Sequence, residues 1–134
     1  MRKMHGCCID QFYDTGLVAL LARWNSSETL MNGALLENYA AAEIAKGYEN
    51  AGREAAIYFY RDKDSKEIDL LLEGDGQLLP LEIKKSSSLA KCMIASFSAL
   101  EKPPLHRGAG ALICLAEHLS AFDRNNFIVP VGLL

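Results

Sequence analysis

The segment from residue 66 to residue 84 constrains the fold most, because it predicts two strands joined by a tight turn. Apolar and polar residues alternate from Lys66 to Glu73, which is the two-residue period of a strand. One predicted face carries Glu67, Asp69 and Leu71, and the other carries Ile68, Leu70 and Leu72. Gly74-Asp75-Gly76 predicts the turn, and Leu78 to Lys84 predicts the returning strand. We therefore expect an antiparallel hairpin.

Helical patterns flank this hairpin on both sides. A short helix is predicted from Asp14 to about Trp24, and a long half-buried helix from Gly33 to about Tyr48. The predicted stop signals of the long helix are Gly47, Asn50 and Gly52. A third helix is expected from Leu89 to Leu100, with Pro103-Pro104 ending it.

Three further segments complete the expected sheet. Ala56 to Tyr60 is rich in aromatic residues, and Ala109 to Leu115 is small and apolar, so each predicts a strand. A polar loop is expected around Arg124-Asn125-Asn126, followed by an extended piece from Phe127 to Leu134. The expected order is α-α-β-β-β-α-β with this last extended piece. Such an order indicates an α/β sandwich with a mixed sheet flanked by helices.

Length and composition predict one folded domain over residues 1–134. The chain has 134 residues, of which 50% are hydrophobic, so it can bury a core. No apolar run approaches the roughly 18–20 residues of a membrane span, and Asp10 and Asp14 interrupt any signal-peptide core. We expect a cytoplasmic protein without a membrane partner. The net charge of −3 provides no general attraction to nucleic acid, so any such contact must be local.

The cysteines predict neither disulfides nor a zinc site. Cys7, Cys8, Cys92 and Cys114 have no paired C-x-x-C spacing, and only His5 lies near two of them. Structural zinc sites usually combine two well-spaced ligand pairs. Reduced thiols are therefore expected.

The strongest chemical signal is a predicted cluster of charges on the hairpin. Glu82 and Lys84 share one face of their strand, and the hairpin can bring Asp69 beside them on the neighbouring strand. Two adjacent carboxylates repel unless a positive charge lies between them, and magnesium prefers oxygen ligands. A metal ion can activate water for phosphodiester hydrolysis while a nearby ammonium stabilises the developing negative charge.

These residues resemble a known signature. Asp69, a gap of twelve residues and then Glu82-x-Lys84 is similar to the catalytic motif of the PD-(D/E)XK nuclease superfamily. Four blocks also resemble a domain-of-unknown-function family that follows an AAA-type ATPase module in many prokaryotic proteins. They are FYDTGL (12–17), GALLENYAAAEI (33–44), YFYRDKDSKEIDLLLE (58–73) and LPLEIKKS (79–86). The blocks lie between residues 12 and 86, and the resemblance extends over nearly the whole chain.

The resemblance implies a restriction-endonuclease-like, three-layer fold and a Mg²⁺ or Mn²⁺ site formed by Glu37, Asp69 and Glu82. It assigns catalysis to Asp69 and Glu82, with Lys84 beside the attacking water. DNA is the implied substrate, with RNA as the alternative, and the implied partner is an AAA-type ATPase in cis or in trans. The chain has no GxxxxGK[ST] loop, so we expect no ATP site in it and interpret it as the C-terminal part of a longer ATPase or as a free-standing remnant.

Two of these residues, Asp69 and Glu37, also have a purely structural interpretation. Without the resemblance, Asp69 would belong to a solvated hairpin face and Glu37 would be an ordinary first-turn acid. Glu43 is a second acidic candidate on the same helix, on a different face.

The basic residues give a weaker prediction. Arg61, Lys63 and Lys85 could contact phosphates, although charged turns are more often simply solvated. The alternative function is a non-catalytic interaction domain that positions an ATPase or mediates contacts between copies of the chain.

Overall fold

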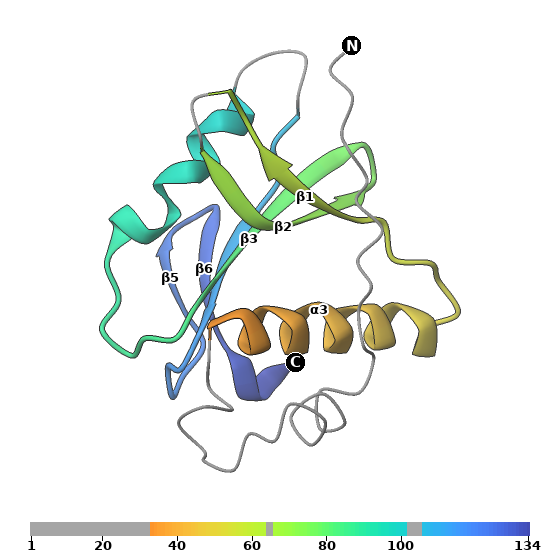
Figure 1. Cartoon of the computed structure of the whole chain (residues 1–134), viewed down its shortest axis with the longest axis horizontal. Coiled ribbons are helices and arrows are strands. Elements are labelled where there is room, and N and C mark those ends of the chain that lie inside the picture. The colour runs from red at the N-terminus through yellow and green to blue at the C-terminus, as the bar shows by residue number, and fades with distance from the viewer. Residues whose placement is uncertain (1–32, 64–65, 102–105) are drawn as a thin grey trace.

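The computed structural model of the chain describes residues 33–63, 66–101 and 106–134. These residues form a mixed α/β fold around one six-stranded sheet of order β1-β2-β3-β4-β6-β5. Helix α3 (Gly33–Asn50) and the 3₁₀ segment η1 (Lys91–Glu101) lie on opposite sides of the sheet (Figure 1). The helix predicted over residues 14–24, Cys7, Cys8 and the Pro103-Pro104 stop lie outside the described residues.

Helix α3 ends where its sequence stop signals predict. Gly52 has a φ of +68°, a conformation that glycine adopts without a steric penalty. The Gly52 N–H donates to the Glu49 carbonyl and the Arg53 N–H donates to the Tyr48 carbonyl, which together form a Schellman motif. Gly47, the other predicted glycine stop, lies inside the helix.

The predicted hairpin is present as β2 (Glu67–Gly74) and β3 (Gln77–Lys84). Gly74 pairs with Gln77, so only Asp75 and Gly76 form the turn. Both have positive φ values, 52° and 73°, as a type I′ turn requires. Strand β1 (Ile57–Arg61) pairs antiparallel with β2 at the edge of the sheet.

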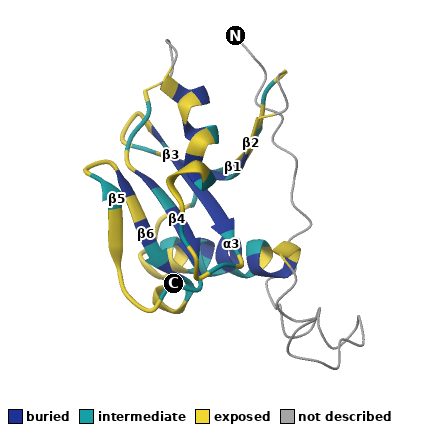
Figure 2. Cartoon of the chain, turned by 90° about the vertical axis from the view of Figure 1, so that its left-hand side faces the viewer, coloured by how far each residue is buried: buried dark blue, intermediate teal, exposed yellow. Residues whose placement is uncertain are grey.

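The second half of the sheet is built from strands that are distant in sequence. β4 (Gly110–Cys114) pairs parallel with β3, and β6 (Asn126–Pro130) pairs parallel with β4. β5 (Ser120–Asp123) is the antiparallel edge strand next to β6. Figure 2 shows the central strands largely buried and β5 largely exposed.

Two hydrophobic clusters occupy the two faces of the sheet. Leu36 and Ala40 of α3 pack against Leu70, Leu81 and Ile113 on one face. On the other face, the 3₁₀ segment contributes Ile94, Phe97 and Leu100 to a second cluster that includes Leu71, Leu112 and Ile128. Asp69 and Glu82 therefore lie on internal strands of a well-packed sheet rather than on a free hairpin.

The expected element order was wrong in three places. The third helix is a 3₁₀ segment with a kink at Ile94 (φ −108°, ψ 18°), not an α-helix. An additional strand, β5, precedes the predicted loop, because pairing with β6 satisfies its backbone hydrogen-bonding groups. The extended piece predicted from Phe127 to Leu134 ends at Pro130 and continues as the short 3₁₀ segment η2 (Val131–Leu133).

The described residues contain no helix with both the length and the apolar character needed to cross a membrane.

Candidate active site

A bulge in β2 sets the position of Asp69. Tyr58 pairs with Leu71 and Tyr60 pairs with Ile68, so two steps along β1 correspond to three steps along β2. The extra residue breaks the strict alternation predicted for β2, and Ile68 therefore joins Leu71 in the cluster beneath η1. Bulges of this kind redirect side chains and are common beside active sites.

The Asp69 side chain takes the place of a backbone acceptor between β2 and β3. The register of the two strands runs from Gly74↔Gln77 to Leu70↔Leu81. Beyond that pair, the Ile83 N–H donates a hydrogen bond of 2.8 Å to Asp69 Oδ2. The carboxylate is thus fixed to the backbone of the neighbouring strand.

Lys84 joins the two carboxylates of the predicted cluster. Its Nζ lies 3.2 Å from Asp69 Oδ2 and 2.7 Å from Glu82 Oε1. Glu82 and Lys84 alternate along β3 and therefore project from the same face. The side chains of Asp69 and Glu82 are only 17% and 10% exposed, whereas that of Lys84 is 38% exposed. A single ammonium group between the half-buried Asp69 and the buried Glu82 offsets the repulsion between the two carboxylates.

A fourth residue, Ser96 on η1, contacts the cluster and was not identified from the sequence. Its hydroxyl donates a hydrogen bond of 3.2 Å to Glu82 Oε2. The available signal was its position on the helix predicted from Leu89 to Leu100. Ser96 lies three residues after Met93 and four before Leu100, so it borders the apolar face that the predicted helix would pack on the sheet.

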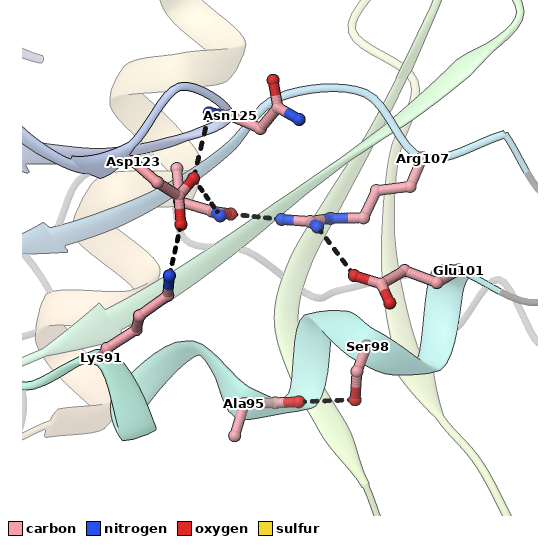
Figure 3. A network of polar contacts seen from close by, with 8 residues as sticks. Lys91, Ala95, Ser98, Glu101, Arg107, Asp123 and Asn125 are labelled. Atoms are coloured by element: carbon pink, nitrogen blue, oxygen red, sulfur yellow. Dashed lines mark hydrogen bonds and ion pairs between the residues drawn. The ribbon is translucent and has the colours of Figure 1, made fainter.

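A polar network fixes the segment that carries Ser96 (Figure 3). At one end of η1, Lys91 Nζ lies 2.7 Å from Asp123 Oδ2, and hydrogen bonds from Lys91 and from the Asn125 backbone N–H lower the pKa of Asp123 to about 2. At the other end, Glu101 pairs with Arg107 at 3.2 Å. Arg107 also donates to the buried Asn126 side chain. One end of η1 is therefore tied to the last residue of β5, and the other is tied through Arg107 to the first residue of β6.

Burial and charge perturb the carboxyl groups of the site. Desolvation, and then the charge of Asp69, raise the pKa of Glu82 above its ordinary value. Burial alone would lower the pKa of Lys84, but its hydrogen bond to Glu82 and the charges of Asp69 and Glu82 raise it instead. Lys84 therefore remains an ammonium at neutral pH. Ionisable groups with perturbed pKa values gather at functional sites more often than elsewhere.

Glu37 on α3 belongs to the same electrostatic environment. Desolvation and then the negative charge of Asp69 raise its pKa, while Lys84 opposes this effect. The half-buried Glu37 is not in the first turn of α3, so the alternative of an ordinary first-turn acid does not apply. Glu43, the other candidate on this helix, forms an ion pair of 2.8 Å with Lys46.

The three predicted basic contacts do not join the cluster. Arg61 forms an exposed ion pair with Glu67, with 3.0 Å between Nε and Oε1. Lys63 is exposed in the connection between β1 and β2, and Lys85 is exposed directly after β3.

Asp69 and Glu82 are the two carboxylates of the predicted metal site that the structure brings into contact with one ammonium group. Within residues 33–63, 66–101 and 106–134, no group of three or more His, Cys, Asp or Glu side chains is already arranged to hold a metal ion. Glu37, Asp69 and Glu82, the three ligands predicted from the sequence, therefore do not form such a group. Both contacts of Asp69 described above use Oδ2 and neither uses Oδ1. Carboxylate oxygens are the preferred protein ligands of Mg²⁺.

The surface also contains a groove that does not include the charged cluster. It is an apolar groove of about 470 Å³ between the second half of α3 and the sheet, lined by Ile44, Tyr48, Leu81 and Val129 among others. Asp69, Glu82 and Lys84 are not part of its lining. The acidic residue in its lining, Glu43, forms an ion pair with Lys46. We therefore assign the candidate chemistry to the charged cluster, where two carboxylates meet one ammonium group.

Comparison with known proteins identifies a family for most of the chain. Searches of curated proteins and of solved structures found no match. Residues 32–134, which include all the residues of the charged cluster, match the family described as "Domain of unknown function (DUF4143)". The chain therefore belongs to the DUF4143 family.

Proposed function

We propose that this domain is a divalent-metal-dependent nuclease of the PD-(D/E)XK type that hydrolyses phosphodiester bonds of DNA. The observation that carries the proposal is the contact of Lys84 with both Asp69 and Glu82, which lie on adjacent strands. Glu37 on α3 supports it, because the charges of Asp69, Lys84 and Glu82 also act on its carboxyl group. The four residues combine acidic oxygen ligands with one ammonium.

The proposal extends to a restriction-endonuclease-like fold. Its support is the order of α3, three antiparallel strands, η1 and the parallel strand β4. Strands β5 and β6 are additions to that core. The 3₁₀ geometry of η1 departs from it, because an α-helix is expected at that position. The fold alone does not establish an activity, so the argument for function depends on the site.

Each residue of the cluster has a distinct proposed role. Asp69, Glu82 and Glu37 would hold Mg²⁺ or Mn²⁺ through carboxylate oxygens. When bound, such an ion polarises a phosphoryl oxygen and lowers the pKa of a bound water. Lys84 would release the carboxylates and direct its ammonium toward the water or the developing negative charge on the phosphoryl group. Ile83, through its backbone N–H, would keep Asp69 in place.

The proposed biological context is an AAA-type ATPase, acting in cis or in trans. Its support is the order of the four sequence blocks described above. Because the chain contains no GxxxxGK[ST] loop, ATP hydrolysis would depend on that partner. An assay of the isolated chain should therefore report metal-dependent cleavage without a need for ATP.

Cleavage assays with matched variants test the proposal. The chain is incubated with single-stranded, duplex and branched DNA, and with RNA, in the presence of Mn²⁺, Mg²⁺ or EDTA. We expect metal-dependent DNA cleavage that falls by at least about 100-fold in Asp69→Asn and in Glu82→Gln. Asp75→Asn in the hairpin turn and Glu73→Gln on the exposed part of β2 repeat the same chemical changes away from the cluster.

Three results are informative. Cleavage that survives in Asp69→Asn would place the activity elsewhere and contradict the proposed site. Cleavage confined to RNA would support the proposed site but show that the substrate is RNA rather than DNA. If the wild-type chain binds Mn²⁺ and cleaves none of these nucleic acids, the non-catalytic interaction domain is the better interpretation.

A further inference from the structure

Ser96 and Lys84 hold the two oxygens of Glu82 from different parts of the fold. Lys84, two residues along β3, contacts Oε1 at 2.7 Å. Ser96, on η1, donates to Oε2 at 3.2 Å. We infer that Ser96 is a positioning residue that orients the Glu82 carboxylate for binding of a divalent cation. This inference rests on the proposed function, and it adds a residue that the sequence motif does not contain.

Glu82 requires such a partner because of where it lies. The residue is 7% exposed and stands on a central strand between the apolar residues Leu81 and Ile83. A buried carboxylate without hydrogen-bond donors is strongly unfavourable. In the proposed reaction the Lys84 ammonium turns toward the substrate. It then no longer stabilises the Glu82 carboxylate. Ser96 remains available, because its hydrogen bond to Glu82 Oε2 does not involve Lys84.

The chemistry of a hydroxyl also suits a neighbour of a metal ligand. Ser96 is neutral, so it stabilises the carboxylate without repelling a cation, whereas a second lysine at the same place would oppose metal binding. One hydrogen bond to Oε2 leaves other lone pairs of the carboxylate available for a ligand contact. Partners of this kind orient metal ligands, and their loss commonly lowers metal affinity 10–100-fold.

The segment that carries Ser96 is anchored well enough to hold this geometry. Ile94, Phe97 and Leu100, which lie on both sides of Ser96 in sequence, are buried in the core. A Cβ atom on Gly110 of β4 would come within 2.7 Å of the Phe97 ring, so η1 lies close against the sheet there. The network around Lys91 and Arg107 fixes both ends of η1 (Figure 3).

Ser98 provides a matched control on the same segment. Its hydroxyl donates a hydrogen bond of 2.8 Å to the carbonyl of Ala95, and the residue is exposed (Figure 3). Ser98→Ala therefore makes the same chemical change in η1 without touching the charged cluster. Any effect shared by Ser96→Ala and Ser98→Ala reports on the helical segment rather than on Glu82.

The test measures Mn²⁺ binding by isothermal titration calorimetry, together with kcat and KM for DNA cleavage, on the full chain. We expect Ser96→Ala to weaken Mn²⁺ binding about 10–100-fold and to lower kcat more than it raises KM. Ser96→Thr, which keeps the hydroxyl, should restore binding to within a few-fold of wild type. Ser98→Ala should match wild type in both measurements. Circular dichroism shows whether each variant folds, and Ser96→Cys replaces Ser96→Ala if the latter does not.

The outcomes separate this inference from the function on which it rests. If wild type binds Mn²⁺ and Ser96→Ala binds it equally well, the role of Ser96 is wrong while the metal site stands. Equal losses in Ser96→Ala and Ser98→Ala would also overturn the inference, because the effect would then be general to η1. If wild type itself binds no Mn²⁺, the proposed function fails, and the inference fails with it.

Discussion

Lys84 Nζ lies 2.7 Å from Glu82 Oε1 and thereby occupies the position between two carboxylates that a cation would share. Removing the ammonium should leave Asp69 and Glu82 repelling each other. Because Lys84 is partly exposed, we expect Lys84→Met to lower the free energy of unfolding by about 1–2 kcal/mol without metal. Millimolar Mn²⁺ should raise the melting temperature of this variant more than that of wild type.

Thermal denaturation with and without Mn²⁺ checks this prediction. Lys66→Met, a change at an exposed lysine just before β2, serves as the control. A Lys84→Met protein that is as stable as wild type and gains no more from Mn²⁺ would show that the ammonium does not offset the two carboxylates.

The bond from the Ile83 N–H to Asp69 predicts a difference between two substitutions at one position. Asp69→Asn retains an oxygen acceptor, whereas Asp69→Ala leaves a backbone donor without its partner. An unsatisfied buried donor costs about 1–3 kcal/mol, so urea denaturation should show Asp69→Ala to be less stable than Asp69→Asn by about that amount. Equal unfolding midpoints for the two variants would argue against this bond.

The raised pKa of Glu37 predicts a pH dependence of stability. Because the folded-state pKa lies above the model value of 4.5, the folded chain binds more protons than the unfolded chain between these two values. The stability attributable to Glu37 therefore falls as the pH rises from 4.5 through the raised pKa. Glu37→Gln should make this decline shallower.

Unfolding free energies measured across this pH range test the sign. Glu73→Gln, an exposed change on β2, should leave the slope of wild type unaltered. A Glu37→Gln slope as steep as that of wild type would show that burial and the charge of Asp69 do not raise the pKa of Glu37 in the folded chain.

The contact between Gly110 and Phe97 predicts that a single methyl group destabilises the fold. A Cβ at Gly110 would lie 2.7 Å and 2.9 Å from two atoms of the buried Phe97 ring. Gly110→Ala should lower stability by about 1–3 kcal/mol, the usual effect of overpacking. Gly47→Ala, in α3 with nothing within 4 Å, should instead raise stability by up to about 1 kcal/mol. Melting temperatures that shift in the same direction for both variants would contradict this packing.

Neighbouring asparagines before and at the start of β6 should respond differently to truncation. The Asn126 side chain is buried and contacts both Arg107 and Asp123, whereas the Asn125 contact is made by its backbone N–H. Asn126→Ala should therefore cost about 1–3 kcal/mol, because it leaves the buried part of the network unsatisfied. Asn125→Ala should be nearly neutral. Denaturation midpoints that rank the two variants in the opposite order would refute this role.

Local sequence determined the centre of the fold. The two-residue alternation and the Asp75-Gly76 turn specify the β2–β3 hairpin, because both positive φ values suit these residues and the turn length sets the register. Once that register is set, Glu82 and Lys84 must share a face near Asp69. The stop of α3 at Gly52 is local for the same reason.

Tertiary structure decided the bulge in β2, the formation of β5 and the contact of Ser96 with Glu82. Each of these features depends on contacts between segments that are distant in sequence. The bulge that brings Ile68 into the same cluster as Leu71 reflects the pairing of β2 with β1, which the alternating pattern of β2 does not encode. Strand β5 has four residues and becomes a strand only by pairing with β6. Ser96 meets Glu82 because η1 packs across the sheet through Phe97 and Leu100. The sequence thus determined which charges gather on the hairpin, whereas long-range packing decided how their oxygens are oriented, since orientation depends on contacts between separate elements.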